Sequence, residues 1–249
     1  MNAKEIYSYL DKVFKFNNQE EWDNSIAHFH NFHPVRKILI CLDINENIYQ
    51  ISKKNEVDLV ISHHPLFTEP PSSKNFHTRK LLGKFKNNNI SLIFLHTPFD
   101  KSIYGMNTKL ASKLNLFDIN VAKDNMTIIG KTRKCKLYKF AKIAKSSLES
   151  DFASYLSRYK NIDVEKVAIC GGSAASNMYD LIDEDFDVFI TCDLKHHAWI
   201  DSVDLNIPII NLNHNIENIF IDEVATRLRE FLVNVDIIKA KSSLHIVYL

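Results

Sequence analysis

The chain has 249 residues, 45% of them hydrophobic, so it can bury one large α/β core or two smaller ones and is not disordered. Its 31 Lys and Arg residues balance 30 Asp and Glu residues, giving a formal net charge of +1. This balance excludes a global positive field that would concentrate nucleic acid or anionic lipid. No apolar run reaches the roughly 18 residues of a membrane-spanning helix. The four cysteines form no C-x-x-C pair, and we predict a cytoplasmic protein without a membrane partner.

The first half of the chain alternates helix and strand patterns. Near the amino terminus, Ile6, Leu10, Val13 and Phe14 fall on one face of an amphipathic helix. Strands are then predicted at residues 35–42, 58–63 and 90–96, and helices at residues 47–55, 78–86 and 106–114. Helices of this length between strands imply right-handed crossovers, so the three strands should lie parallel in one doubly wound sheet.

The second half begins with a less regular pattern. Residues 127–130 and 136–143 are interpreted as strands of a more exposed sheet, followed by a helix at 148–159 that Ser146 and Ser147 would cap. The alternation then resumes, with strands at 166–170, 187–191 and 207–212 and helices at 194–203 and 218–231. The tail, at 235–239 and 244–248, should close as a hairpin or return to a sheet.

These patterns predict an α/β fold of two interleaved domains, with mostly parallel sheets flanked by helices. We place the first domain at residues 1–120 and the second at 121–249, with the option that the carboxyl-terminal part returns to the first. A metal site is expected at the carboxyl edge of the strands, between the domains, because histidines gather there.

Histidines stand at the carboxyl ends of several predicted strands. His63 and His64 follow an apolar run, and Pro65 then prevents the backbone from continuing as a helix. The other histidine-bearing strand ends hold His96 with Asp100, His196 with His197, and His214 with Glu217. Ligands bind at this edge of an open α/β sheet, and neutral imidazole is the commonest side-chain metal ligand. Each histidine alone also fits a capping or buried structural role, but four such ends in one sheet favour a shared metal cavity.

Two further stretches bear on a site. Glu217 follows His214 by three residues in the first turn of a predicted helix, and this spacing lets both side chains ligate together. Gly171-Gly172-Ser173 comes directly after a predicted strand. Its backbone N–H groups would be able to cradle a phosphate, although a plain tight turn is the preferred interpretation.

Several motifs occur in an order that is similar to the Nif-three-like family, whose members are often called GTP cyclohydrolase 1 type 2 homologs. They are DLVISHHPLF, FLHTPFD followed by Gly105-Met106-Asn107, VAICGGSAAS, DVFITCDLKHH and NHNIE, together spanning residues 22–231 with Trp22-Asp23-Asn24. The chain departs from the family where Cys192 replaces a glycine, where Glu217 follows His214 by three residues instead of four, and where a glycine is missing after Asn24.

The resemblance implies a dinuclear divalent-metal site. The implied ligands are His63, His64, Asp100, His214 and Glu217, with His96 in or beside the first ligand shell. This mixture of imidazole and carboxylate suits two ions of zinc, iron or manganese better than calcium or magnesium. The resemblance also implies a closed homo-oligomer, most plausibly a hexamer.

Two functions remain open from the sequence. The first is a metal-dependent hydrolase of a nucleotide or related small phosphorylated or cyclic substrate, with Glu217 and His96 as catalytic residues. The second is a ring-forming regulatory or nucleic-acid-binding protein that holds metals without turnover, against which the near-zero net charge counts.

Overall fold

A computed structural model describes residues 1–66 and 76–241, which form two compact α/β units. Of the described residues, unit 1 contains 1–99 and 220–241, and unit 2 contains Asp100–Ile219. The chain therefore passes from unit 1 to unit 2 after Phe99 and returns after Ile219, whereas the sequence placed a boundary near residue 120. The expected α/β class with two helix-flanked sheets is confirmed.

Unit 1 is built on a five-stranded sheet in the order β1-β4-β3-β2-β11. The strands are β1 (Ala27–His28), β2 (Lys37–Cys41), β3 (Leu59–Ser62), β4 (Ser91–Phe94) and β11 (Asp236–Ala240). The strands β4, β3, β2 and β11 are parallel neighbours, and only β1 runs antiparallel. The predicted parallel arrangement of the first three strands is confirmed. The predicted strand 235–239 returns to this sheet as β11, while the prediction at 244–248 lies outside the described residues.

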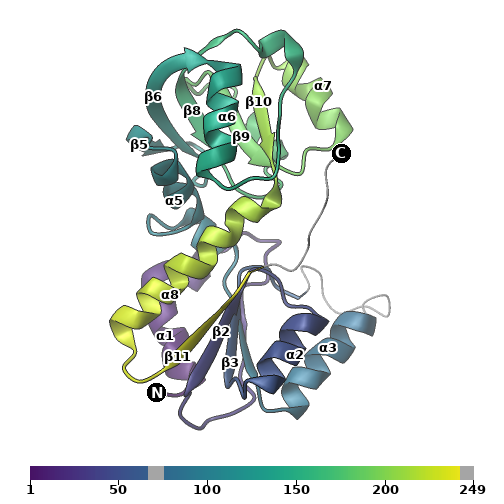
Figure 1. The fold of residues 1–249 in the computed structure, drawn as a ribbon, viewed down its shortest axis with the longest axis vertical. Helices are drawn as coiled ribbons and strands as arrows, with labels where there is room; N and C mark the ends of the chain where they lie inside the picture. The colour runs from purple at the N-terminus through teal and green to yellow at the C-terminus, as the bar shows by residue number, and fades with distance from the viewer. Residues whose placement is uncertain (67–75, 242–249) are drawn as a thin grey trace. The chain divides into compact units, whose positions relative to one another are not determined.

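Helices cover both faces of the sheet in unit 1. They are α1 (Ala3–Phe14), α2 (Glu46–Lys54), α3 (Phe76–Asn87) and α8 (Ile219–Phe231). In Figure 1, α2 and α3 lie on one side of β2 and β3, and α1 and α8 on the other. Tyr49 of α2 and Phe85 of α3 pack with Leu92 and Phe94 of β4 in one buried cluster. Burial of such side chains stabilises the parallel strands, whose continuous apolar sequences require cover on both faces.

Unit 2 contains a six-stranded sheet in the order β5-β6-β8-β9-β10-β7. The strands are β5 (Phe117–Val121), β6 (Ile128–Lys136), β7 (Ala153–Ser154), β8 (Asp163–Ile169), β9 (Val188–Cys192) and β10 (Ile209–Leu212). The neighbours β8, β9 and β10 pair in parallel, whereas β5, β6 and β7 pair antiparallel with their neighbours, so this sheet is mixed. The helices are α5 (Met106–Lys113), α6 (Leu137–Ser147) and α7 (His196–Asp204).

Short helical turns connect these elements. They are η1 (Phe16–Asn18), α4 (Thr97–Lys101), η3 (Ser157–Tyr159), η4 (Ala175–Tyr179) and η5 (His214–Asn218). The helix α4 follows β4 directly and carries the chain out of unit 1. Among the residues that the structure describes, no helix is both long enough and apolar enough to cross a membrane.

Two predictions about the middle of the chain were wrong. Of residues 136–143, predicted as a strand, Lys136 ends β6 but residues 137–143 belong to the helix α6. Residues 148–159, predicted as a helix, contain β7 and the turn η3. The buried residues of α6 are Leu137, Phe140, Ala141 and Ala144. Their spacing of three, four and seven residues is the period of a helix that packs on one face. This period, and not the local content of aromatic and β-branched residues, decides the conformation.

The sequence predicted that the histidine-bearing strand ends share one sheet. The structure divides them between two sheets. The ends of β3 and β4, which carry His63, His64 and His96, belong to unit 1. The ends of β9 and β10, which precede His196 and His214, belong to the sheet of unit 2. Each unit therefore presents its own set of strand-end side chains.

Candidate metal centre

Three histidines meet at the carboxyl edge of the sheet in unit 1. One side-chain nitrogen from each of His63, His64 and His96 lies within 4.8 Å of the other two. The backbone N–H groups of His63 and His64 donate to the carbonyls of Cys41 and Leu42 at 3.3 and 3.0 Å. These bonds continue the β3 to β2 pairing to the point where Pro65 follows, and so fix both histidines at the strand end.

The Nδ1 atom of each histidine is held by an oxygen. His63 Nδ1 lies 3.0 Å from the carbonyl of Leu95, His64 Nδ1 lies 2.7 Å from a carboxylate oxygen of Asp43, and His96 Nδ1 lies 2.9 Å from a carboxylate oxygen of Asp23. An oxygen acceptor at Nδ1 favours the tautomer with its proton there, which leaves the Nε2 lone pair for a ligand. Metal-binding histidines characteristically have this partner.

Asp23 anchors His96 through a dense hydrogen-bond network. Its carboxylate is fully buried and accepts from His96 Nδ1, the backbone N–H of Thr97, the Thr97 hydroxyl and the Ser25 hydroxyl. Burial alone would raise the pKa of Asp23, but these hydrogen bonds and the electrostatic interaction with His96 outweigh it and hold the pKa well below its usual range. Asp23 is therefore ionised, and it fixes the orientation of the His96 ring.

The wall behind His63 is aromatic. Its ring centroid lies 6.0 Å from that of Phe99 and 5.1 Å from that of Phe220, and His63 is fully buried. His64 and His96 keep 22% and 15% of their side chains exposed. A ligand from solvent therefore approaches through His64 and His96, while the apolar wall lowers the local dielectric and strengthens electrostatic interactions there.

Unit 2 brings His214 and Glu217 together in η5, directly after β10. His214 Nε2 lies 2.8 Å from a carboxylate oxygen of Glu217, and His214 Nδ1 bonds to the carboxylate of Asp193 after β9. Burial acts to lower the pKa of His214, but Glu217 and Asp193 outweigh it and raise this pKa to about 11. His214 is therefore protonated on both ring nitrogens at neutral pH. A metal ion that binds His214 must displace one of these protons, because only neutral imidazole ligates.

The Gly171-Gly172-Ser173 loop packs closely against Glu217. A Cβ atom at Gly172 would stand 3.0 Å from Glu217 Oε1, and Gly172 has a φ of +70°, a conformation that glycine adopts readily. The backbone N–H of Gly171 donates to Asn107 Oδ1 at 2.8 Å, and the carbonyl of Gly172 accepts from the backbone N–H of Cys192 at 2.9 Å. These bonds within the protein favour the tight-turn interpretation over a phosphate cradle.

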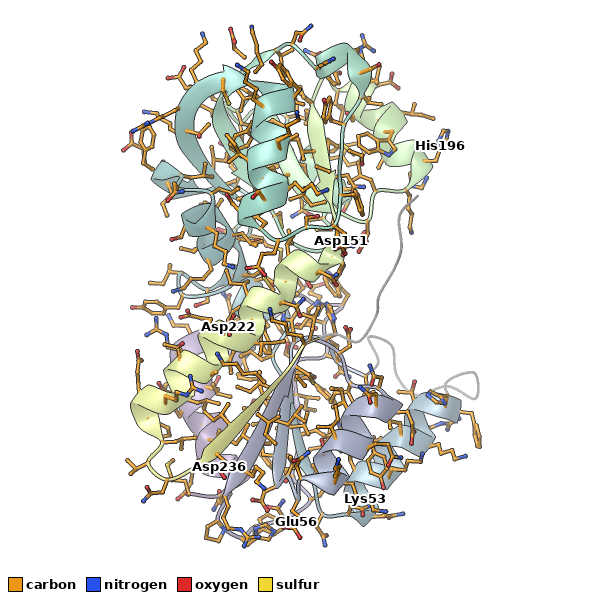
Figure 2. All side chains as sticks on the ribbon, in the orientation of Figure 1. Lys53, Glu56, Asp151, His196, Asp222 and Asp236 are labelled. Carbon is orange, nitrogen blue, oxygen red and sulfur yellow. The ribbon has the colours of Figure 1, made fainter. Side chains whose placement is uncertain are left out.

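The other predicted residues, Asp100, His196 and His197, belong to unit 2. Asp100 is in α4 and belongs to unit 2, where its charge, after burial, helps to raise the pKa of the Cys170 thiol well above its usual value. Cys170 is thus a neutral, buried core residue. His196 and His197 are exposed at the start of α7, where Figure 2 labels His196.

The sequence did not single out three carboxylates that contact the candidate ligand histidines. Asp23, Asp43 and Asp193 each hold the Nδ1 atom of a candidate ligand histidine. Asp43 and Asp193 follow strands β2 and β9, so the strand-end argument that selected the histidines would also have selected them. Asp23 lies in the Trp22-Asp23-Asn24 segment, which attracted notice only as part of a family resemblance.

The fold and these side chains define a class: an α/β protein of two units whose strand ends carry candidate ligands for a transition metal. Comparison with known families matches residues 1–244 to Duf34/NIF3 (NGG1p interacting factor 3). The chain belongs to this family.

Relatives support the assignment. A protein of Ureaplasma parvum serovar 3, named GTP cyclohydrolase 1 type 2 homolog, is 32% identical over 248 residues, covering 94% of this chain and 92% of its own. A Bacillus cereus protein related to NIF3 has the same fold, with a TM-score of 0.87, 19% identity and coverage of 100% and 99%. Reduced HcgD from Methanocaldococcus jannaschii aligns with a TM-score of 0.82, 25% identity and coverage of 96% and 97%.

Proposed function

We propose that this protein binds two divalent transition-metal ions and hydrolyses a nucleotide or a related small phosphorylated or cyclic substrate. The observation that carries the metal part is the set of Nδ1 acceptors on His63, His64 and His96. Three convergent imidazoles, each with an oxygen partner, match zinc, iron or manganese better than a cation that prefers oxygen ligands alone.

The proposed ligands also include residues of unit 2, as the family resemblance implies. His214 and Glu217 supply a second imidazole and carboxylate set, and Asp100 completes the five ligands His63, His64, Asp100, His214 and Glu217 that the family resemblance implies. Bound ions of this kind supply Lewis acidity to a substrate oxygen. The donor chemistry of the residues fits such ions.

Glu217 is the proposed proton acceptor. Its carboxylate is 3% exposed and lies 2.8 Å from His214 Nε2, within the reach over which a positioned base takes or passes a proton. His96 is the proposed contact to substrate, because it is partly exposed and Asp23 fixes its ring. A nucleotide substrate is supported by the name that the Ureaplasma relative carries.

The alternative is a ring-forming regulatory or nucleic-acid-binding protein with structural metals. Self-association, as a hexamer, belongs to both proposals and is supported by the edge strand β5. This strand exposes Phe117, Ile119 and Val121 at 50%, 42% and 52%, and an apolar edge of this kind is a site where chains pair. A formal net charge of +1 favours the enzyme over the nucleic-acid binder.

Turnover separates the two proposals. Protein loaded with zinc or manganese is assayed against a panel of nucleotides and phosphate esters, beside Glu217→Gln and the exposed control Glu149→Gln. Glu217→Gln is nearly isosteric and fits beside Gly172, but it removes the negative charge. We expect hydrolysis to fall about a hundredfold or more in this variant, the scale lost with a metal ligand or its support, with fold and oligomer kept. If the wild type hydrolyses nothing faster than Glu217→Gln does, the binding role replaces the enzyme.

A further inference from the structure

Trp22 is a large aromatic side chain that the fold leaves open to solvent. It is 56% exposed and lies in a turn closed by the hydrogen bond from the Asp23 backbone N–H to the Glu20 carbonyl at 3.0 Å. Single exposed apolar residues are common on protein surfaces and require no explanation by themselves. The position of Trp22 is what distinguishes it.

The backbone next to Trp22 is tied to the histidine site. The buried carboxylate of Asp23 accepts from the backbone N–H of Thr97 at 3.1 Å and from the Thr97 hydroxyl at 2.6 Å. The backbone N–H of Glu20 in turn donates to the Thr97 hydroxyl at 3.0 Å. Bonds on both sides of Trp22 therefore anchor its turn to the first residue of α4, directly after His96.

The indole of Trp22 borders the exposed side of the triad. Its ring lies edge to face with His96, with centroids 5.5 Å apart and an interplanar angle of 75°. This contact covers only part of the indole, since more than half of the residue remains exposed. An anchored aromatic surface thus stands beside the two histidines through which a ligand from solvent approaches.

We propose that Trp22 is a stacking platform for the purine ring of a nucleotide held at the histidine cluster. An indole face binds planar bases through stacking, whatever the base sequence, and the polar groups of the same ligand then reach His64 and His96. The proposal rests on the proposed function, in that it assigns the base-binding part of that nucleotide site. It assigns to Trp22 a role in specificity and not in proton transfer.

The two tryptophans of the chain make a direct optical test available. The second tryptophan, Trp199, lies on α7 in unit 2. Because the chain has two tryptophans, Trp199→Phe leaves Trp22 as the only one. Titration with Ni²⁺ should quench Trp22 emission if the ion binds beside His96, because quenching by such ions acts at short range. Absence of quenching would contradict the metal site, and with it the proposed function, without any measurement of turnover.

The base-binding step is tested in the zinc-loaded protein. We expect GMP to quench Trp22 emission further and ribose 5-phosphate, which lacks the ring, to leave it unchanged. In equilibrium dialysis, Trp22→Ala should bind GMP about tenfold or more weakly, the scale of one lost base stack, whereas Trp22→Phe should keep most of the affinity. The zinc content of all variants should equal that of the wild type.

Three results would overturn the platform while leaving the metal site intact. The first is Ni²⁺ quenching together with equal GMP binding by wild type and Trp22→Ala. The second is equal quenching by GMP and ribose 5-phosphate. The third is a lower sedimentation mass for Trp22→Ala, which would assign Trp22 to a contact with a second copy of the chain.

Discussion

At the scale of single residues, the orientation of His96 depends on Asp23. Asp23→Asn keeps the size of the side chain but converts one carboxylate oxygen, which now accepts from His96 or Thr97, into an amide donor. We expect the zinc affinity of the protein to fall about 10- to 100-fold, the usual effect of losing such a carboxylate behind a ligand histidine. Competition with a chromogenic chelator measures this affinity.

The matched control for this variant is Asp236→Asn. Asp236 is an exposed carboxylate at the first residue of β11 (Figure 2), and its replacement should leave the zinc affinity unchanged. Equal affinities for Asp23→Asn and the wild type would mean that Asp23 has a structural role only.

The sequence identified the candidate ligand histidines, which the structure brings together, but it did not identify the carboxylates that contact them. His63, His64 and His96 were recognised because a buried apolar run, a histidine and a proline leave little freedom in where the side chain goes. The carboxylate partners come from other parts of the chain: Asp23 is 73 residues from His96, and Asp43 is 21 residues from His64. Such pairings depend on the order of strands in the sheet, which periodicity alone does not provide.

At the scale of elements, α2 begins with a side-chain cap that supports the sheet of unit 1. The Asn45 side chain accepts from the backbone N–H of Ile48 at 3.0 Å, and Ile48 and Tyr49 then bury their side chains in the unit 1 core. We expect Asn45→Ala to lower the free energy of unfolding by about 1 kcal/mol, because an N–H group at the helix start loses its partner. Urea denaturation measures this loss.

Gln50→Ala on the same helix is the control for the cap. Gln50 is exposed, and among the described residues its side chain bonds to Glu46 of the same helix, so the expected change is within about 0.5 kcal/mol. If both variants lose the same stability, the cap contributes nothing specific.

Elements were predicted well where a strand is apolar throughout, as in β2, β3 and β4, since such a run requires burial on both faces. The short strands β1 and β7, with two residues each, carry no periodicity to read. The prediction for the residues of α6 was wrong for a different reason. Phe140 and Ile143 are residues that strands also favour, yet Phe140 is fully buried while Ile143 is 47% exposed, and only the helical period accounts for this difference.

At the scale of the whole molecule, we expect the protein to self-associate. The family resemblance predicts a hexamer, and the exposed apolar residues of β5 support a contact between copies. We expect sedimentation equilibrium at micromolar concentration to give a mass of about six times the 28.8 kDa chain. A mass equal to one chain would contradict the prediction and leave the edge of the unit 2 sheet without an explanation.

The strand-end histidines are proposed to hold metal, and elemental analysis of the purified protein measures whether they do. We expect about two transition-metal ions per chain after reconstitution with zinc or manganese. His64→Ala should lose at least one of them, since it removes one of three convergent imidazoles. Less than about one ion per two chains in the reconstituted wild-type protein would contradict the claim, because a site built for metal fills under these conditions.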